Sequence, residues 1–378
     1  MIKTILLLNP VYVTLFWVVV LSFYRSRKHA PKIFLGKFMF VAFVLYISHY
    51  FYFTGQYKVY SYLDSIYTLA SLAVYPLYHI YVRLLTVDRV LSPSLHLKYL
   101  ALPAMVFLLH LTGYLLMDDS ETMHYLKMVL PGRDSGQGVT GYMGMVYTLF
   151  RVVFIFQVIV YLYLNYRLIS THNDHLLEFY SNIEERKLDW VQFFNFSFAV
   201  TSLASIFAAI LGRDIFNASD LHLAVPSVIF SVMLFIIGLL GNTQREVYTE
   251  PSQHVAGTNR SGSGLSRQLV RKMEDLFEKE MIFKNPDLKI WNLCSILGTN
   301  RTYVSRLINS EYDRNFCNHV NHYRVEYSKK LLSQNQHLSN EEIAEMSGFG
   351  SVNSLYRSFK SFEKKSLGEY RKNPDAHN

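Results

Sequence analysis

Two stretches near the C-terminus follow the same pattern, LCSILGTNRTYVSRLI at residues 293–308 and IAEMSGFGSVNSLYRSF at residues 343–359. In each stretch a short apolar helix is predicted to end at a glycine, Gly298 or Gly348, and a second helix is predicted to follow. Glycine suits the turn because it adopts a positive φ angle without steric cost. The repeated pattern predicts two helix-turn-helix units.

Each unit also carries residues that fit the crossing of its two helices. A small residue, Cys294 or Ala344, stands four positions before the glycine, where only a small side chain fits between the helices. An apolar residue, Val304 or Leu355, then anchors the second helix on the first. Residues 339–342, Ser-Asn-Glu-Glu, form a capping box, which predicts a helix start before the second unit.

The composition of the 378-residue chain differs strongly between its two halves. The chain is 51% hydrophobic, and its mean hydropathy is positive. The apolar excess lies almost wholly before Asn242, which indicates a membrane domain. The two cysteines, Cys294 and Cys317, have neither CxxC nor Cys/His spacing, so we expect structural thiols in a reducing compartment and no metal site.

The first 241 residues contain apolar runs that are long enough to cross a bilayer. The first run is followed by basic residues and lacks the small-x-small cleavage site of a signal peptide. It is therefore predicted to be a retained anchor and not a signal peptide. The predicted spans are Ile5–Tyr24, Phe38–Phe53, Val59–Leu85, Leu97–Met117, Tyr142–Tyr166, Val191–Leu211 and Leu223–Leu240.

The distribution of basic residues predicts the orientation of these spans. If the N-terminus lies outside, the inside loops hold eleven Lys and Arg residues and the outside segments hold five. Basic residues favour the cytoplasmic side. Seven spans then place everything after Gly241 in the cytoplasm.

Several predicted spans contain side chains that are costly in hydrocarbon, and such residues are functional candidates. They are Asp64, His79, His110, Arg151 and Gln157. One interpretation is that Asp64 and Arg151 lie near span ends or satisfy one another inside the bundle. The other is that Asp64, His79 and Arg151 line a pocket that senses a small-molecule or periplasmic signal.

Two loops leave alternatives open. The inside loop 173–187 contains Leu176, Leu177, Phe179 and Ile183, which fit either an amphipathic helix at the membrane surface or a continuation of the preceding span. The outside loop 118–140 is rich in glycine and fits either a lid or a flexible connection.

The sequence predicts three regions, a membrane domain at 1–241, a linker at 242–266 and a DNA-binding domain at 267–373. Gly, Ser, Thr, Asn and Gln dominate the linker, which we expect to be a flexible tether with a root-mean-square span of roughly 25–30 Å. Apolar residues then recur at helical spacing and predict an amphipathic helix. These residues are Leu269, Met273, Leu276, Phe277 and Met281.

The region 269–372 resembles the AraC/XylS type of DNA-binding domain. The resemblance rests on the paired units, on Asn-Pro-Asp-Leu at 285–288, on Gly-Thr-Asn-Arg-Thr-Tyr-Val-Ser-Arg at 298–306 and on Glu-Tyr-Arg at 369–371. It implies seven short helices, with a joining helix at about 316–333. The predicted fold class is therefore all-α, a seven-span helical bundle followed by a double helix-turn-helix domain. A joining-helix stripe of Phe316, Val320, Tyr323, Tyr327 and Leu331 is expected to be core.

The chain departs from the family pattern in two places. Asp313 stands where the family usually has Gly, and Asp tolerates the left-handed conformation. Glu363, Lys364 and Leu367 replace the usual Phe, Gly and Pro, so the geometry of the last turn is not predicted.

In a helix-turn-helix the second helix enters the major groove and its outward residues meet the bases. The predicted outward residues are Arg301, Thr302, Ser305 and Arg306 in the first unit, and Asn353, Ser354, Tyr356, Arg357 and Lys360 in the second. By resemblance, base contacts fall on Thr302, Ser305, Arg306, Asn353 and Arg357. Arg pairs with guanine and Asn with adenine.

Some of these residues have a second interpretation. Arg306 and Arg357 also fit contacts to phosphate, which take half or more of the hydrogen bonds to DNA. Asn300 is expected to cap the second helix of its unit and not to read a base. Residues 267–373 hold 18 Lys and Arg against 13 Asp and Glu, and this net charge of +5 favours a DNA partner.

The sequence thus predicts a transcription regulator in the bacterial inner membrane, multi-pass, with a cytoplasmic C-terminal domain that binds promoter double-stranded DNA. Its further candidate partners are the lipid bilayer, a second copy of the chain and a sensed signal. The alternative is a membrane sensor or transporter-like protein whose helix-turn-helix tail binds a protein. An enzyme is not expected, because no HExxH, GxSxG, GxGxxG or Walker motif occurs, and no cofactor is predicted.

Overall fold

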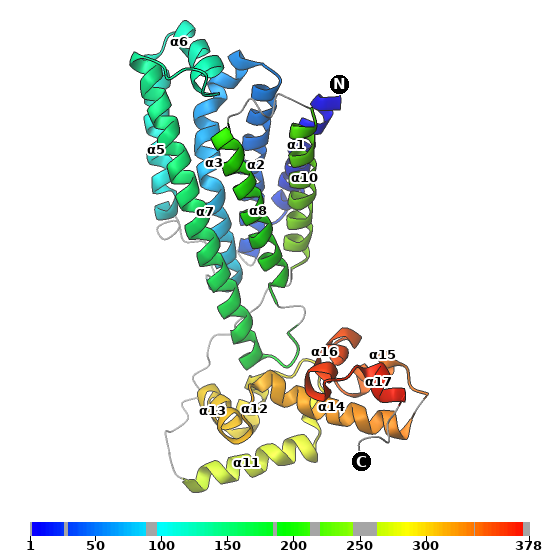
Figure 1. The fold of residues 1–378 in the computed structure, drawn as a ribbon. Helices are drawn as coiled ribbons and strands as arrows, with labels where there is room; N and C mark the ends of the chain where they lie inside the picture. Colours follow the sequence, from blue (N-terminus) through cyan, green and yellow to red (C-terminus); the bar gives the residue numbers. More distant parts are fainter. Residues whose placement is uncertain are drawn as a thin grey trace. The chain divides into compact units, whose positions relative to one another are not determined.

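The structure is a computed structural model that describes residues 2–25, 29–87, 97–183, 187–211, 220–244, 263–335 and 337–372. Within these ranges every regular element is helical, which confirms the predicted all-α class (Figure 1). The basic loop residues Arg27, Lys28, Arg89 and Arg186 lie outside the described residues, as does most of the predicted linker, 245–262. The chain divides into two compact units, one of residues 1–170 and 188–244 and one of residues 171–187 and 245–378.

The first unit is a bundle of long helices, and each predicted span overlaps one of them. Two short elements, η2 and η3, and a short helix, α6, connect the long ones. The elements are α1 (Ile2–Ser22), α2 (Ala30–Phe53), α3 (Tyr57–Thr86), η2 (Leu97–Leu100), α5 (Ala101–Leu116), α6 (Asp119–His124), η3 (Tyr125–Val129), α7 (Gly138–Phe179), α8 (Asp189–Leu211) and α10 (Asp220–Thr243).

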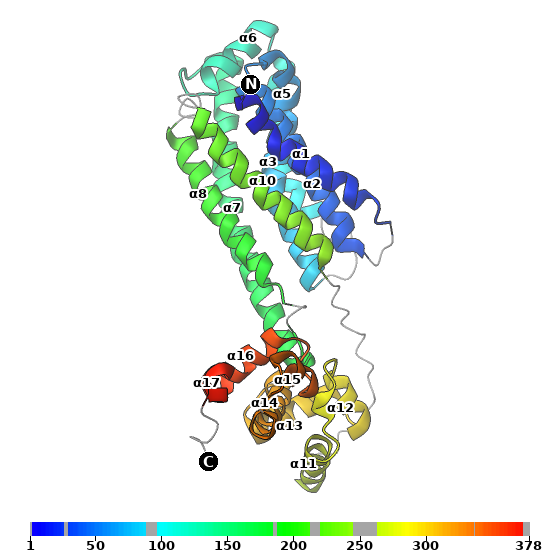
Figure 2. The same cartoon turned by 90° about the vertical axis from the view of Figure 1, so that its right-hand side faces the viewer.

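Neighbouring helices of the bundle pack side by side, and the last helix returns to the first. Helix α2 lies against α1 and α3, and α10 lies against α1 (Figure 2). A Cβ atom at Gly238 of α10 would clash with the ring of Trp17 on α1. The glycine therefore allows the two backbones to approach closely, as small residues do between membrane helices.

The bundle has an apolar interior and an apolar exterior. Leu35, Ile80 and Phe194 are buried in its core, whereas Leu115, Met145 and Phe196 are more than 60% exposed. Extensive exposed apolar surface on a helical bundle is the pattern of a protein that faces lipid.

Among the residues that the structure describes, five helices have the length and apolar composition to cross a membrane. These candidate spans are Thr4–Ser22, Ala30–Phe53, Leu97–Leu116, Gly138–Phe179 and Ala224–Thr243. The predicted spans Val59–Leu85 and Val191–Leu211 correspond to α3 and α8, which are not among these five. Helix α3 is 30 residues long but carries polar side chains in its buried face, including Asp64 and His79. The seven-span count remains a prediction.

The segment predicted to be an outside lid or connection is largely helical. Asp118 and Glu121 form a capping box that begins α6. Tyr125, Leu126 and Leu130 are at most 1% exposed in the same segment. It is therefore packed onto the bundle.

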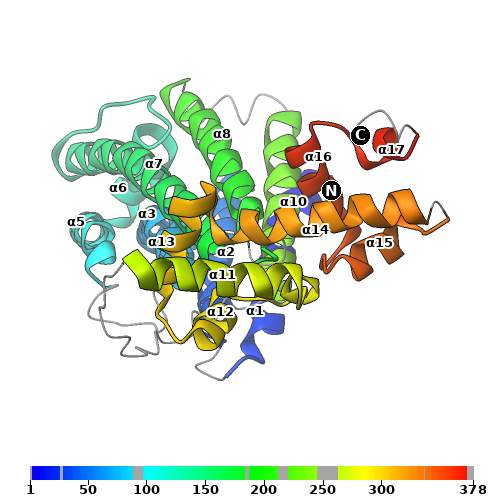
Figure 3. The ribbon, with the colours of Figure 1, turned by 90° about the horizontal axis from the view of Figure 1, so that it is seen from below.

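The second unit contains the end of α7 and the C-terminal helices. Its middle helix, α14, runs between the pair formed by α12 and α13 and the pair formed by α15 and α16 (Figure 3). The elements are α11 (Ser263–Glu278), η4 (Ile282–Lys284), α12 (Ile290–Leu297), α13 (Arg301–Tyr312), α14 (Phe316–Gln334), α15 (Asn340–Met346), α16 (Val352–Glu363) and α17 (Leu367–Lys372).

Helix α14 is the predicted joining helix, and it contributes to two separate cores. Phe316 and Val320 in its first half pack with α11, α12 and α13. Val325 and Leu332 in its second half pack with α15, α16 and α17. One rigid helix thus fixes the two helix-turn-helix units relative to each other. The predicted amphipathic helix is α11, although Met281 lies beyond its end with a φ angle of 51°.

Candidate DNA-binding interface

The first helix-turn-helix unit is formed by α12 and α13. Helix α12 ends at Gly298, whose φ angle is 62°. Asn300 then caps α13, because its side-chain oxygen accepts a hydrogen bond of 2.9 Å from the Tyr303 backbone N–H. Val304 is fully buried beneath the helix. The predicted turn, cap and anchor are all confirmed in this unit.

The second unit is formed by α15 and α16. The predicted capping box is present, with Ser339 and Glu342 bonded to each other's backbone N–H groups. Gly348 has a φ angle of 81°, and a Cβ atom there would lie 2.5 Å from the carbonyl oxygen of Phe283. Glycine is therefore required both by the conformation and by the space. Ser351 caps α16 through the Ser354 N–H.

Most of the predicted DNA-facing side chains are accessible. Thr302, Arg306, Asn353, Tyr356, Arg357 and Lys360 are exposed, and Arg301 and Ser305 are half-buried. The prediction was wrong about the direction of Ser354, which is 7% exposed. Ser354 stands next to the anchor Leu355 near the start of α16, and its side chain turns toward the core of its unit.

Tyr356 is held in place by a hydrogen-bond chain between three helices. Its hydroxyl accepts a bond of 2.7 Å from the Asn340 amide on α15. The Asn340 amide oxygen in turn accepts a bond of 3.0 Å from Arg371 on α17. Tyr356 therefore presents its ring from a fixed position on the outer face of α16.

Arg324 on α14 was not among the predicted site residues, although it is central to the unit. Its side chain is fully buried. It donates bonds of 2.8 Å to the carbonyl oxygens of Phe283 and Asn285, which lie in the segment before α12. The sequence carried a signal, since Arg324 falls four residues after Val320, on the apolar stripe of the joining helix.

Burial shifts the pKa values of several groups in this unit. It lowers the pKa of Arg324 to about 10, so the guanidinium remains charged at neutral pH. It raises the pKa of Cys294 and Cys317 to about 11, which keeps both thiols protonated and unreactive. Burial also lowers the pKa of His319 to about 3, so this imidazole is neutral.

Asp313 and Lys364, which replace glycines of the family pattern, both adopt the left-handed backbone conformation. Asp313 ends α13 with a φ angle of 49°. Lys364 ends α16 with a φ angle of 58°, and its N–H donates to the Lys360 carbonyl oxygen. The last turn therefore has a helix-terminating geometry without glycine, at a modest conformational cost.

The predicted sensor residues, which belong to the first unit, do not meet in one place. Asp64 is 2% exposed and accepts hydrogen bonds from Tyr60 at 2.6 Å and Tyr114 at 2.8 Å. His79 lies 2.7 Å from the amide oxygen of Asn165. The Arg151 guanidinium lies over the Tyr147 ring, 4.4 Å from its centre. Asp64 and Arg151 therefore have different partners and do not neutralise one another.

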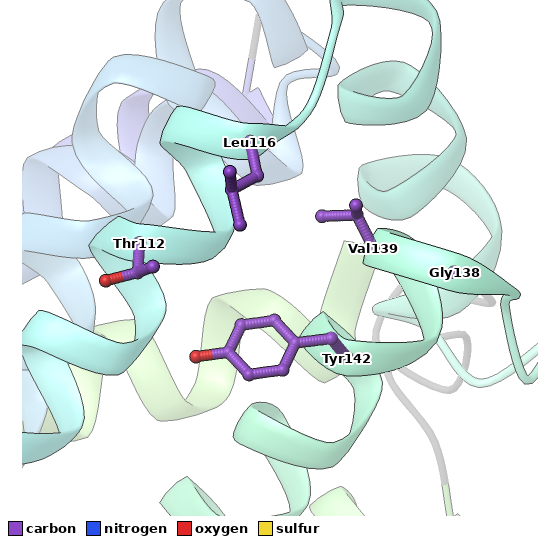
Figure 4. A pocket seen from close by; sticks show the side chains of 5 residues that line it. All are labelled: Thr112, Leu116, Gly138, Val139 and Tyr142. Atoms are coloured by element: carbon purple, nitrogen blue, oxygen red, sulfur yellow. The ribbon is translucent and has the colours of Figure 1, made fainter.

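A pocket in the first unit lies apart from these residues. It has a volume of about 370 Å³ and lies between the end of α5 and the start of α7 (Figure 4). Its lining consists of Thr112, Leu116, Gly138, Val139 and Tyr142. None of these residues is charged, so the lining offers no charged group to a ligand. The Tyr142 hydroxyl is already used, because it donates to the Leu109 carbonyl oxygen.

Comparison with protein families gives a match at residues 293–373, to a family described as a helix-turn-helix domain. No significant match was found among curated proteins or among solved structures. The matched residues begin within α12 and include both turn glycines, both recognition helices, α13 and α16, and the joining helix. Residues 293–373 therefore match a helix-turn-helix domain of the AraC type, and helices apolar enough to span a membrane precede them.

Proposed function

We propose that the protein is a membrane-embedded transcription regulator that binds promoter DNA sequence-specifically through α13 and α16. The observation that carries the proposal is the pair of capped recognition helices fixed on one joining helix, each with at least one exposed basic side chain. Arg306 projects from α13, and Arg357 and Lys360 project from α16. Two such helices on one rigid element can enter successive major grooves of one duplex.

The roles of the side chains follow from their chemistry. Arg306 and Arg357 have the bidentate geometry that suits guanine, and Asn353 suits adenine. Thr302, Ser305 and Tyr356 offer hydroxyl groups to bases or phosphates, and Lys360 offers a point charge to a phosphate. The N-termini of α13 and α16 add backbone N–H groups that favour phosphate.

The proposal places the first unit in the bacterial inner membrane and the second in the cytoplasm. Its support is the exposed apolar surface of the bundle and the five candidate spans. A tag after residue 378 tests the orientation. Protease should remove the tag from inside-out vesicles and leave it intact on sealed cells, and the opposite result would exclude access to DNA.

DNA binding is tested with the full-length protein in detergent micelles. The protein is incubated with a randomised duplex library, and bound duplexes are sequenced after several rounds. We expect a motif with two half-sites about one helical turn apart. The Arg306→Ala, Arg357→Ala double variant serves as the matched control and should enrich no motif. If the full-length protein enriches no motif, the proposed function is wrong.

A further inference from the structure

Residues 176–183, here called the docking segment, belong to the second unit. They pack against its helix-turn-helix domain, here called the DNA-binding unit. Helix α7 continues through the predicted inside loop as far as Phe179, which confirms the interpretation of a continued helix. The chain then turns, and Leu176, Tyr180 and Ile183 are buried in a cluster with Cys317 of α14. The end of α7 lies beside α12 (Figure 1), where the centroids of the Phe179 and Trp291 rings are 5.6 Å apart.

Polar contacts fix the docking segment at its centre. The Ser181 N–H and Oγ both donate to the Leu288 carbonyl oxygen, at 3.1 and 2.7 Å. Tyr180 forms an antiparallel bridge with Lys289. Arg324 donates to the Ser181 carbonyl oxygen at 3.3 Å and to its Oγ at 3.1 Å. The segment thus uses directional bonds as well as apolar contact.

The docking segment also reaches the start of both recognition helices. The Phe179 ring lies 4.6 Å from the guanidinium carbon of Arg301, the first residue of α13. Asn182 lies against Gly350, which directly precedes the N-cap of α16, and a Cβ atom built on Gly350 would lie 2.9 Å from the Asn182 Cγ. These are the ends of the helices that contact bases and phosphates in a helix-turn-helix.

We infer that the docking segment is an autoinhibitory element that competes with DNA for the DNA-binding unit. This inference rests on the proposed function. DNA bound at the N-termini of α13 and α16 would occupy the positions that Phe179 and Asn182 take in the docked segment. The segment must therefore leave before both helices can bind DNA. The occupant of this surface is therefore a segment of the same chain, and the covalent continuity of α7 links it to the membrane unit.

Regulation then follows from a shift between a docked and a released state. A docked state favoured tenfold would weaken apparent DNA affinity about tenfold. A signal that moves α7 can change this ratio without touching the recognition helices. The surface suits such a switch because apolar contacts and hydrogen bonds are lost together when the segment leaves.

Release is tested in the full-length protein in detergent micelles, with the Phe179→Ala, Ser181→Ala double variant. The probe is a duplex enriched from a randomised library with this variant. We expect the variant to bind at least about tenfold more tightly than the parent. The exposed His175 lies on the same helix, and His175→Ala should leave the affinity at the parent value.

The docked state is tested with the Asn182→Cys, Gly350→Cys double variant. A Cβ atom built on Gly350 would lie 2.9 Å from the Asn182 Cγ, which brings the two positions within reach of a disulfide. The oxidised protein should lose DNA binding and regain it on reduction, whereas Asp174→Cys with Gly350→Cys should form no such bond. Each single cysteine variant controls for substitution alone and for pairing with Cys317.

The outcomes separate the inference from the proposed function. If the parent, the release variant and the oxidised double-cysteine variant bind DNA equally, the docking segment does not compete with DNA and the inference is wrong. If none of them binds, reduced or oxidised, the proposed function itself is wrong.

Discussion

The Arg324 guanidinium donates to both oxygens of Ser181, over 3.3 Å to the carbonyl oxygen and 3.1 Å to the Oγ atom. The same group holds the carbonyl oxygens of Phe283 and Asn285. One buried cation therefore joins α14, the segment before α12 and the docking segment. The docking segment therefore shares a buried cation with two other parts of the same unit.

Arg324→Ala is expected to destabilise the second unit by about 2–5 kcal/mol, because it leaves buried carbonyl groups without their donor. The free energy of unfolding is measured by denaturant titration of the full-length protein, followed by a fluorophore attached to the second unit. Lys330 is exposed on the same helix, and Lys330→Ala should change the stability by less than about 0.5 kcal/mol. Equal stability of the two variants would refute the structural role of Arg324.

Asn300→Ala should cost about 1 kcal/mol, because the N-cap bond to Tyr303 is lost. The first turn of α13 then frays, so DNA affinity should fall as well. Asn309 is exposed on the same helix and makes a matched control, since Asn309→Ala removes no cap. The cap assignment fails if both alanine variants unfold at the same denaturant concentration.

His319 is expected to make the second unit less stable in acid. Its ring lies between two aromatic rings, with its centroid 4.8 Å from that of Phe277 and 4.5 Å from that of Tyr312. Burial, reinforced by Arg314 and His322, lowers its pKa from 6.5 to about 3. The unfolded chain binds a proton below pH 6.5 whereas the folded chain does not, so stability is full above this pH and falls below it. The loss is about 2 kcal/mol at pH 5.

The measurement is the free energy of unfolding against pH for the parent and for His319→Phe, which cannot take up the proton. The slope between pH 6.5 and 5 should flatten in His319→Phe. The exposed His337 gives the control His337→Phe, which should retain the parent slope. A parent stability that does not change over this range would contradict the prediction.

Tyr114→Phe is expected to destabilise the membrane unit by about 1–3 kcal/mol, because the buried Asp64 carboxylate loses a donor at 2.8 Å. Thermal unfolding in detergent micelles measures the effect. Tyr62 is 76% exposed, so Tyr62→Phe should unfold at the parent temperature. An unchanged midpoint for Tyr114→Phe would show that Asp64 does not need this bond.

Local signals in the sequence predicted much of the second unit. The turn glycines, the caps at Asn300 and Ser339 and the joining helix each depend on residues within a few positions of one another. Side-chain direction was predicted less well at Ser354, because the inward face near the start of α16 also depends on the core formed by α15 and α17. The role of Arg324 required knowing that Phe283 and Asn285 lie opposite it.

The contacts of the docking segment could not be predicted in the same way. The apolar residues of 173–187 fitted both a surface helix and a continued span. Ser181 and Arg324 are 143 residues apart, so no local periodicity relates them. The sensor residues illustrate the same limit, because the partners of Asp64 and Arg151 are set by helix packing and not by spacing along the chain.

The most direct test of sequence-specific DNA binding is the affinity of Arg306→Ala and Arg357→Ala for the enriched duplex and for its single base-pair variants, over a range of salt concentrations. Both substitutions are placed in the full-length protein that also carries Phe179→Ala and Ser181→Ala. Each arginine variant should lose preference at one base pair, by about 1–3 kcal/mol, and keep the salt dependence of the parent. Uniform weakening on all duplexes with a smaller salt slope, or no change in affinity, would contradict base reading by these two residues.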